Sequence, residues 1–417
     1  MISTSLLRIF LTGSFRPFVF GNIPTKSLDY QNEKQLGLYI HIPFCLSLCS
    51  FCPYCKVIYN KNTAIEYKEA LLREIDLVGS ELTEKKEVTS LYFGGGTPSL
   101  MIDDLFDIVT VLQKYFRIKN GIGIELHPND VSDKNLTLLK NAGVNMISIG
   151  VQSFDRNCLS LIGRAYDDFS KKIRIAEQYE FDVIDVDLIF ALPGQTEEIL
   201  LSDIETAFSS GATQISTYPF IDFTFSNNKY KPLSEKYKKR LLEVINRYCI
   251  ATDKERTSVW TFTLKNTQQY SSVTRDNFLG FGVSATTLLH KQFKINTFSI
   301  KAYIERIKMN RLPTSLTLHF SFRQRIVYYL FWRFYGTKIN KIQFRNFFGI
   351  DLYKIYPFEL FLGKIVGLIK EDETNYFLTE KGIYYYHLIE QKYTNAYIDK
   401  MWNISRNVDF PEKIVLR

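Results

Sequence analysis

The chain has 417 residues, 46% of them hydrophobic, with 52 lysines and arginines against 44 aspartates and glutamates. This length favours one large catalytic body plus a smaller domain, and the apolar fraction is enough for a real core. The formal charge of +8 comes without a zinc-finger or helix-turn-helix pattern, which argues against nucleic-acid binding. An anionic substrate such as a polycarboxylate is compatible with it.

The first 28 residues contain no acidic residue, and the stretch 6–20 is apolar with two arginines. We treat residues 1–35 as an N-terminal leader. Packing on the enzyme body, or a loose leader, is favoured over a targeting role or contact with a membrane surface. No run reaches the roughly 18 apolar residues of a membrane span.

From residue 36 onward, apolar runs alternate with amphipathic stretches. Strands are predicted at 37–42, 88–93, 121–126, 145–150, 182–190 and 214–218, and helices at 63–79, 103–115, 132–141, 168–179 and 196–210. Six such units predict an α/β fold, a partial (β/α)6 TIM-like barrel over 36–233.

The alternation stops beyond this core. Residues 234–316 are predicted to extend the barrel on the substrate side, with a helix at 235–252, a strand at 258–262 and a glycine-punctuated segment at 278–285 that closes back on the barrel. Residues 317–417 are predicted to form a helical or winged-helix-like domain, with the wing at 371–382.

Four of the six cysteines, Cys45, Cys49, Cys52 and Cys55, fall within one short loop after the first predicted strand. This crowding indicates a metal or cluster site, whereas a secreted disulfide framework spreads its cysteines, so a reducing cytoplasmic location is expected. The remaining cysteines, Cys158 and Cys249, are predicted to be small core residues in helices.

The spacing CxxxCxxC gives three thiolates, which on a four-iron cube leave one iron open for a small molecule. Including Cys55 gives a closed four-thiolate site, either zinc or an electron-transferring cluster, as the competing interpretation. Structural zinc sites usually split their ligands into two separated pairs, and this chain has no second pair.

A second motif, Gly94, Gly95, Gly96, Thr97 and Pro98, follows the second predicted strand. Consecutive glycines allow close backbone approach to a polar ligand. Alone, such a turn is more often a tight connection, and no Lys-Ser/Thr follows to make it a P-loop.

Together the two motifs resemble the radical S-adenosylmethionine enzymes, in the branch of oxygen-independent coproporphyrinogen III dehydrogenases and heme chaperones. The resemblance runs from about Leu36 into the C-terminal module. It implies that Cys45, Cys49 and Cys52 bind a 4Fe-4S cluster, whose fourth iron is chelated by S-adenosylmethionine. It also implies cofactor-binding roles for Tyr39, Phe51, Gly94, Gly95, Gly96, Thr97, Glu125, Gln152, Arg164 and Asp187.

Without the resemblance, these residues have ordinary interpretations. Glu125 and Arg164 would be a surface ion pair, Gln152 a capping group and Asp187 a hydrogen-bond acceptor. His41 is expected to be a packed imidazole and not an iron ligand.

The chain departs from both subgroups. Tyr54 occupies the place of the dehydrogenases' fourth cysteine, and Cys55 comes one residue later. Residues 270–278 replace the His-Asn-aromatic-Trp element of the heme chaperones, whereas 279–285 is similar to the dehydrogenases.

The leading hypothesis is oxidative decarboxylation of a porphyrinogen-type tetrapyrrole, with a low-potential electron donor protein as partner. The alternatives are a heme-binding chaperone and a radical methyltransferase or cyclase acting on a substrate unrelated to heme.

Overall fold

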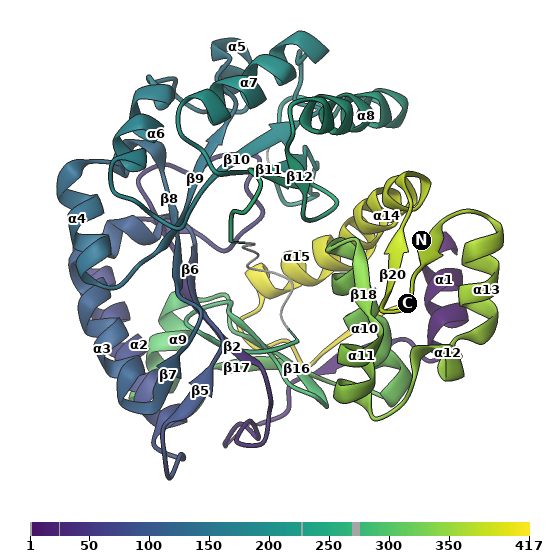
Figure 1. Ribbon diagram of the computed structural model, residues 1–417. Helices are drawn as coiled ribbons and strands as arrows, with labels where there is room; N and C mark the ends of the chain where they lie inside the picture. Colours follow the sequence, from purple (N-terminus) through teal and green to yellow (C-terminus); the bar gives the residue numbers. More distant parts are fainter. Residues whose placement is uncertain (1, 25, 227, 269–275) are drawn as a thin grey trace.

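The computed structural model describes the chain except residues 1, 25, 227 and 269–275 (Figure 1). Its centre is a run of six neighbouring strands that all pair in parallel. They are β2 (Leu36–Ile42), β6 (Leu91–Gly95), β8 (Ile122–Leu126), β9 (Met146–Gln152), β10 (Val183–Phe190) and β11 (Gln214–Pro219). Most of their residues are buried, as expected for strands covered on both faces.

Helices cover the outer face of these strands (Figure 1). They are α2 (Lys61–Gly79), α3 (Leu105–Tyr115), α4 (Asp133–Asn141), α5 (Arg156–Leu161), α6 (Phe169–Glu177), α7 (Glu197–Ser209) and α8 (Glu235–Ala251). Side-chain caps start several of them, including Asn60 for α2 and Ser132 for α4, which satisfy amides that the first helical turn leaves free. The predicted partial (β/α)6 barrel is confirmed.

The parallel core continues into antiparallel strands at both edges. Beside β11 lie β13 (Thr261–Thr263) and β12 (Glu255–Arg256). On the other side β14 (Asn277–Phe281) pairs in parallel with β2, and the sheet then runs through β15 (Thr286–Leu288), β16 (Gln292–Asn296), β17 (Thr314–His319), β1 (Phe18–Gly21) and β21 (Lys413–Leu416). Because β12 and β21 are the two ends of one sheet, the barrel stays open.

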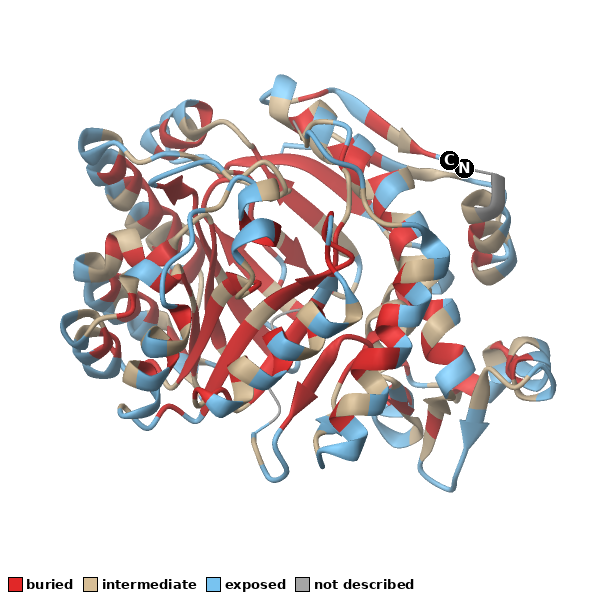
Figure 2. Cartoon of the chain, turned by 90° about the horizontal axis from the view of Figure 1, so that it is seen from above, coloured by how far each residue is buried: buried red, intermediate tan, exposed pale blue. Residues whose placement is uncertain are grey.

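Short pairs and one more helix complete the barrel region. They are β3 (Phe44–Cys45) with β4 (Val57–Ile58), β5 (Lys86–Val88) with β7 (Phe116–Ile118), and α9 (Ile300–Lys308). In Figure 2 the strands are predominantly buried, and the surrounding helices alternate buried and exposed faces.

Glu74 connects α2 to the segment that follows β14. Its buried carboxylate accepts hydrogen bonds from the Gly282 amide at 2.7 Å, Asn296 Nδ2 at 3.0 Å and the Tyr303 hydroxyl at 2.6 Å. Three donors from three further segments compensate for taking this carboxylate out of water. Gly280 is equally constrained, since a Cβ there would lie 2.1 Å from the Thr286 carbonyl oxygen.

The C-terminal part contains α10 (Phe322–Tyr335), α11 (Lys341–Phe348), α12 (Leu352–Ile355), α13 (Pro357–Ile365), α14 (Glu380–Tyr393) and α15 (Asp399–Asn407). Its small sheet has the order β18 (Lys338–Asn340), β20 (Asn375–Leu378), β19 (Ile369–Glu371). The turn between β19 and β20 and the start of α14 match the predicted wing at 371–382.

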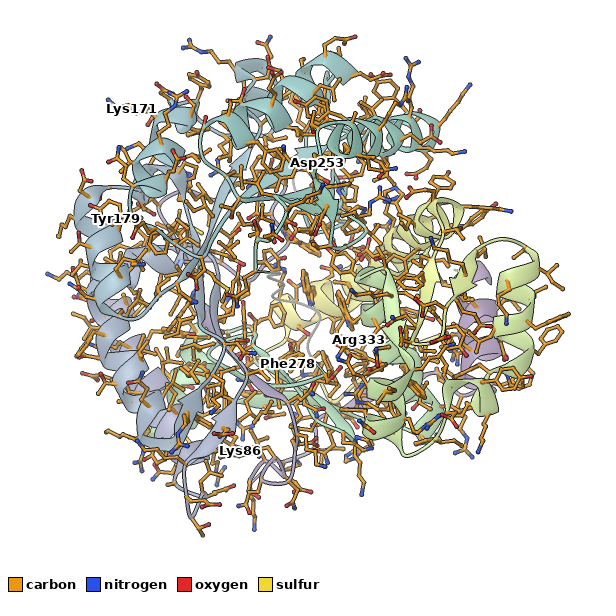
Figure 3. All side chains as sticks on the ribbon, viewed as in Figure 1. Lys86, Lys171, Tyr179, Asp253, Phe278 and Arg333 are labelled. Atoms are coloured by element: carbon orange, nitrogen blue, oxygen red, sulfur yellow. The ribbon has the colours of Figure 1, made fainter. Side chains whose placement is uncertain are left out.

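Two arginines of α10, the buried Arg325 and the half-buried Arg333, attach this part to the barrel sheet. Arg333 pairs with Asp276 at 2.6 Å, and Arg325 donates to Asn277 Oδ1 at 3.1 Å. Figure 3 labels Arg333 and Phe278 on the inner side of the molecule, whereas Lys171 and Tyr179 lie on its outer layer.

Within residues 2–24 and 26–35, one helix and one strand pack on the rest of the chain. Helix α1 (Ile2–Thr12) packs against α10 and α14, and β1 lies between β17 and β21. The domain limits at 35, 233 and 316 stay a prediction. Among the described residues, no helix has the length and apolar character needed to cross a bilayer.

Candidate functional site

The candidate site lies where the central parallel strands end. The register pairs His41 with Gly94 across β2 and β6, and Glu125 with Ser148 across β8 and β9. On β10, Asp187 lies opposite Gly150 of β9. Because the carboxyl ends of parallel strands meet at one edge, the predicted residues of five strands come together there.

The cysteine loop crosses this edge directly after β2. Cys45 lies on the short strand β3, and the electrostatic neighbours of its thiol include Cys49, Cys52 and Lys56. Thr97 Oγ1 lies 3.6 Å from Cys45 Sγ and donates to it, linking the glycine turn to the loop. The structure therefore brings the three predicted ligands into one region.

Burial raises the pKa of Cys45 to about 11 and also raises the pKa of Cys49. These thiols hold their protons at neutral pH, so assembly of a cluster must displace them, as is general for thiolate ligands.

The glycines of the turn are required by close backbone contacts. A Cβ on Gly94 would lie 2.9 Å from Glu125 Oε1, and one on Gly96 would lie 2.7 Å from the Phe44 carbonyl oxygen. Gly95 has φ +125°, a backbone conformation that other residues rarely adopt. The turn therefore packs against the strand that carries Cys45.

Glu125 is anchored beneath this turn. Its Oε2 accepts from the Gly95 amide at 3.1 Å, and its Oε1 accepts from the Tyr92 hydroxyl at 3.1 Å. Burial nevertheless raises the pKa of Glu125 to about 7. A carboxylate held in this way offers a negative charge to a cation at the strand ends.

Asp187 and Arg164 have electrostatic effects on each other. Burial and then the neighbouring Asp185 and Glu125 raise the pKa of Asp187, while Arg164 opposes this rise. The cysteine thiols at 45, 49 and 52 are also among the groups acting on Arg164. Without the family resemblance, the sequence predicts a surface ion pair between Glu125 and Arg164. The ion pairs of the described residues do not include this pair.

Two further predicted site residues are Gln152, at the end of β9, and Phe51, within the cysteine loop. Gln152 is the last residue of β9 and adopts φ 74°, which is uncommon for a residue other than glycine. Phe51 is half-buried and packs against the main hydrophobic core.

Cys55 is buried and contacts segments outside the cysteine loop. Its thiol lies 3.4 Å from the Phe298 carbonyl oxygen, and Arg406 and Ser284 are its electrostatic and hydrogen-bonding neighbours. The role of Cys55 as an extra thiol stays a prediction.

Tyr39 and His41 of β2 are linked to the cysteine loop by hydrogen bonds. The Tyr39 hydroxyl lies 3.0 Å from His41 Nδ1, and His41 Nε2 lies 2.9 Å from the Cys55 carbonyl oxygen. Since a carbonyl only accepts, Nε2 carries the proton and Nδ1 accepts from Tyr39. Burial lowers the pKa of His41 to about 4, so the ring is neutral.

Sequence reasoning missed Asp185. It is buried on β10 opposite Ser148 and Gln214 of the adjacent strands, and its Oδ2 accepts from Ser216 at 2.8 Å. The signal was available, because residues two apart on a strand share a face, so Asp185 lies on the same side as Asp187.

Sequence reasoning also missed α15. Trp402 contacts the Tyr54 ring at 6.0 Å, and Arg406 donates a hydrogen bond to the Pro53 carbonyl oxygen. The guanidinium of Arg406 lies over the Phe225 ring at 4.5 Å. No local pattern reveals these contacts, because each joins residues far apart in the sequence.

The residues present fit the two groups that the resemblance implies. Three thiols share one region, and Arg164 has a buried Nε without a hydrogen-bond partner, as expected of a donor that awaits an anionic ligand group. Among the described residues, no three His, Cys, Asp or Glu side chains are arranged to hold a metal ion. In a four-iron cluster each thiolate instead binds a different iron.

We predict that replacing Cys45, Cys49 or Cys52 by Ala abolishes the brown chromophore of the anaerobically reconstituted protein, because each thiol supplies one ligand. Cys55→Ala is the matched control and should retain it. Absorbance spectra and iron content measure the result, and loss of the chromophore in Cys55→Ala alone would contradict the assignment.

We predict that binding of S-adenosylmethionine, which carries a positive sulfonium, strengthens between pH 6 and 8. Glu125 loses its proton as the pH passes about 7, and its negative charge then attracts the cation. We expect an increase of about threefold to tenfold, the size of a modest charge interaction. Equilibrium dialysis measures the affinity.

The matched variant for this pH effect is Glu125→Gln, which keeps the shape and cannot ionise. Its affinity should change less with pH than that of the wild type. An equal pH dependence in both proteins would show that another group is responsible.

Comparisons with known proteins agree with this geometry. The family model of the radical SAM superfamily matches residues 39–207. The heme chaperone HemW of Bacillus subtilis is 28% identical over 82% of this chain and 95% of its own length. The oxygen-independent coproporphyrinogen III oxidase of Pseudomonas aeruginosa is 25% identical over 70% of each chain.

Among solved structures, coproporphyrinogen III oxidase HemN from Escherichia coli superposes with a TM-score of 0.73 at 22% identity. The match covers 88% of this chain and 91% of HemN, and it supports the fold. Residues 39–207 therefore match the radical SAM superfamily, and the chain as a whole is similar to HemW and the oxygen-independent coproporphyrinogen III oxidases; this similarity implies a 4Fe-4S cluster and S-adenosylmethionine as cofactors.

Proposed function

We propose that this radical SAM enzyme acts on a porphyrinogen-type tetrapyrrole and catalyses its oxidative decarboxylation. The observation that carries the proposal is the group formed by Trp402 and Arg406 of α15, which lies against the cysteine loop at Pro53 and Tyr54. It combines aromatic surface with a fixed positive charge beside the place where the radical would form.

The aromatic surface extends beyond Trp402. Its ring stacks on Phe223 with centroids 6.4 Å apart, and it also contacts Phe298 at 6.5 Å. Flat rings of this kind pack well against a pyrrole. Arg406 has a buried Nε without a hydrogen-bond partner, so it retains a donor for a substrate carboxylate. A tetrapyrrole that bears carboxylate side chains offers a pyrrole to the aromatic rings and a carboxylate to Arg406.

The barrel residues have complementary roles in the proposal. Arg164 would bind the carboxylate of S-adenosylmethionine, Glu125 its positive end, and Asp187 and Gln152 its hydroxyl groups. When bound, the cluster would supply one electron for reductive cleavage of the sulfonium, and the 5′-deoxyadenosyl radical so released would take one hydrogen atom from the substrate. Loss of carbon dioxide and transfer of one further electron to a one-electron acceptor would complete the decarboxylation. The apolar walls and α15 would exclude water from this radical.

The second candidate is a heme-binding chaperone. The observation in its favour is the match with HemW of Bacillus subtilis, which spans 95% of that protein. Against it, the sequence lacks the His-Asn-aromatic-Trp element, and the segment in its place, 270–278, lies partly outside the described residues. A cytoplasmic location and an electron donor protein belong to the proposal in either case.

We predict that the reconstituted protein forms 5′-deoxyadenosine from S-adenosylmethionine under a strong reductant, and that coproporphyrinogen III stimulates this reaction. Chromatography under anaerobic conditions measures the amount of 5′-deoxyadenosine with and without coproporphyrinogen III. The Cys45→Ala variant is the control. Absence of 5′-deoxyadenosine with every reductant would contradict the proposal that the protein is an enzyme.

A heme titration in the same preparation separates the alternatives. Tight stoichiometric heme uptake without decarboxylation would favour the chaperone. Formation of 5′-deoxyadenosine that neither tetrapyrrole affects would favour a methyltransferase or cyclase with an unrelated substrate.

A further inference from the structure

Strands β8 to β11 carry a row of polar side chains on one face. The strand register aligns Glu125 of β8 with Ser148 of β9, and Ser148 with Asp185 of β10. It also aligns Asp185 with Gln214 of β11. Neighbouring strands lie about 4.8 Å apart, so aligned side chains on one face adjoin. Alternate residues such as Ile147 belong to the main hydrophobic core with residues of the covering helices, so the polar row faces the interior of the barrel.

A second carboxyl group, that of Asp187, lies two residues after Asp185 on the same face of β10. Two serines link the carboxyl groups to the adjacent strands. Ser148 Oγ donates to Asp187 Oδ2 at 2.9 Å, and Ser216 Oγ donates to Asp185 Oδ2 at 2.8 Å. Asp185 is 3% exposed, whereas Asp187 is half-buried. Asp187 can therefore meet a ligand at the strand ends, and Asp185 acts on that ligand only through Asp187.

The charges around this pair of carboxyl groups do not balance. None of the ion pairs of the described residues includes Asp185 or Asp187. Arg164 is the cation that opposes the rise in the pKa of Asp187, and it also interacts with the thiols of the cysteine loop. Asp185 Oδ1 is buried and has no hydrogen-bond partner. Two neighbouring carboxyl groups out of water do not both ionise readily, so the pair should keep one proton at neutral pH.

The surroundings of each carboxyl group indicate which one keeps the proton. Burial raises the pKa of Asp185 to about 6, and hydrogen bonds from three side chains limit this rise. Burial raises the pKa of Asp187 well above its ordinary value, the charges of Asp185 and Glu125 add to the rise, and Ser148 and Arg164 oppose it. Asp185 therefore ionises first. The other titratable groups in reach are tyrosines whose pKa values are raised by burial, so they keep their protons: Tyr54, Tyr218 and Tyr335.

We propose that Asp185 is a positioning residue that keeps Asp187 protonated, so that Asp187 presents a hydrogen-bond donor and not a negative charge at the carboxyl ends of the strands. The inference rests on the proposed function only in expecting S-adenosylmethionine as the ligand there. A protonated carboxyl group donates one hydrogen bond, here to a ligand oxygen such as that of a ribose, and still accepts one from Ser148. Glu125 remains the group that offers a negative charge to the sulfonium.

The first test measures protonation in the full-length protein without cofactors. Infrared absorption separates a protonated carboxyl group from a carboxylate, and ¹³C-labelled aspartate separates Asp from Glu. The difference between the wild type and Asp187→Asn should show a protonated aspartate at pH 7. In Asp185→Asn, measured against the double variant, the pH at which this band is lost should fall by about one unit or more, because a neighbouring negative charge is removed.

The matched control is Asp203 of α7, a buried carboxyl group that also accepts from a serine, Ser153, at 2.7 Å. Asp203→Asn should leave the loss of the Asp187 band at its wild-type pH. If Asp185→Asn does not fold, Asp185→Ser replaces it, because it removes the same charge with a smaller polar side chain.

The second readout is the affinity of the reconstituted protein for S-adenosylmethionine, measured by equilibrium dialysis at pH 7. Asp187→Asn should bind within about threefold of the wild type, because a neutral amide replaces a neutral acid. Asp185→Asn should bind about threefold to tenfold more tightly, because an ionised Asp187 then faces the cation. A loss of tenfold or more in Asp187→Asn would show that Asp187 is ionised and would contradict the proposal.

Absence of a protonated aspartate from the wild-type difference spectrum would overturn the proposal. So would an unchanged band after removal of the Asp185 charge, an equal shift in Asp203→Asn, or a proton lost in Asp185→Asn and retained in Asp187→Asn, which would place it on Asp185. The spectra need neither the cluster nor S-adenosylmethionine. Failure of this proposal is therefore distinguished from failure of the enzyme reaction, which the formation of 5′-deoxyadenosine tests.

Discussion

The parallel pairing of β2, β6, β8, β9 and β10 is the constraint on which the candidate site depends. It places Gly94, Glu125 and Asp187 at the same edge as the loop that follows β2. The glycine turn leaves no room for a Cβ, so a change in the spacing of β2 and β6 would separate the loop from Glu125. The site therefore depends on backbone register as well as on side-chain identity.

Acidic and basic side chains occupy different parts of the barrel interior. Glu125, Asp185 and Asp187 place three carboxyl groups among the strands, and burial raises the pKa of each. The cations lie next to the cysteine loop, as Arg164, Lys56 and Arg406. This separation suits a ligand such as S-adenosylmethionine, whose positive sulfonium and negative carboxylate occupy different parts of one molecule.

Much of this arrangement could be predicted from local sequence patterns. Apolar runs and helical spacing located the strands and helices, and Glu125 and Asp187 lie within two of the predicted strands. The roles of these residues came from the family resemblance and stay predictions. Asp185 was missed although its spacing from Asp187 places both on one face.

Other features depend on contacts between distant segments and had no local signal. The N-terminal strand β1 joins the sheet only because β17 and β21 lie on either side of it. Trp402 and Arg406 reach the cysteine loop because α15 packs there, with Asp399 accepting from the Thr224 amide at 2.8 Å. A tryptophan and an arginine on a C-terminal helix are otherwise ordinary surface residues.

The central claim is that three cysteines hold a cluster with one iron open to S-adenosylmethionine. Electron paramagnetic resonance of the reduced cluster, recorded before and after S-adenosylmethionine is added, tests it most directly. The account predicts that the g values shift, because the added molecule becomes a ligand of the fourth iron. An unchanged spectrum at saturating S-adenosylmethionine would show a closed cluster and contradict the account.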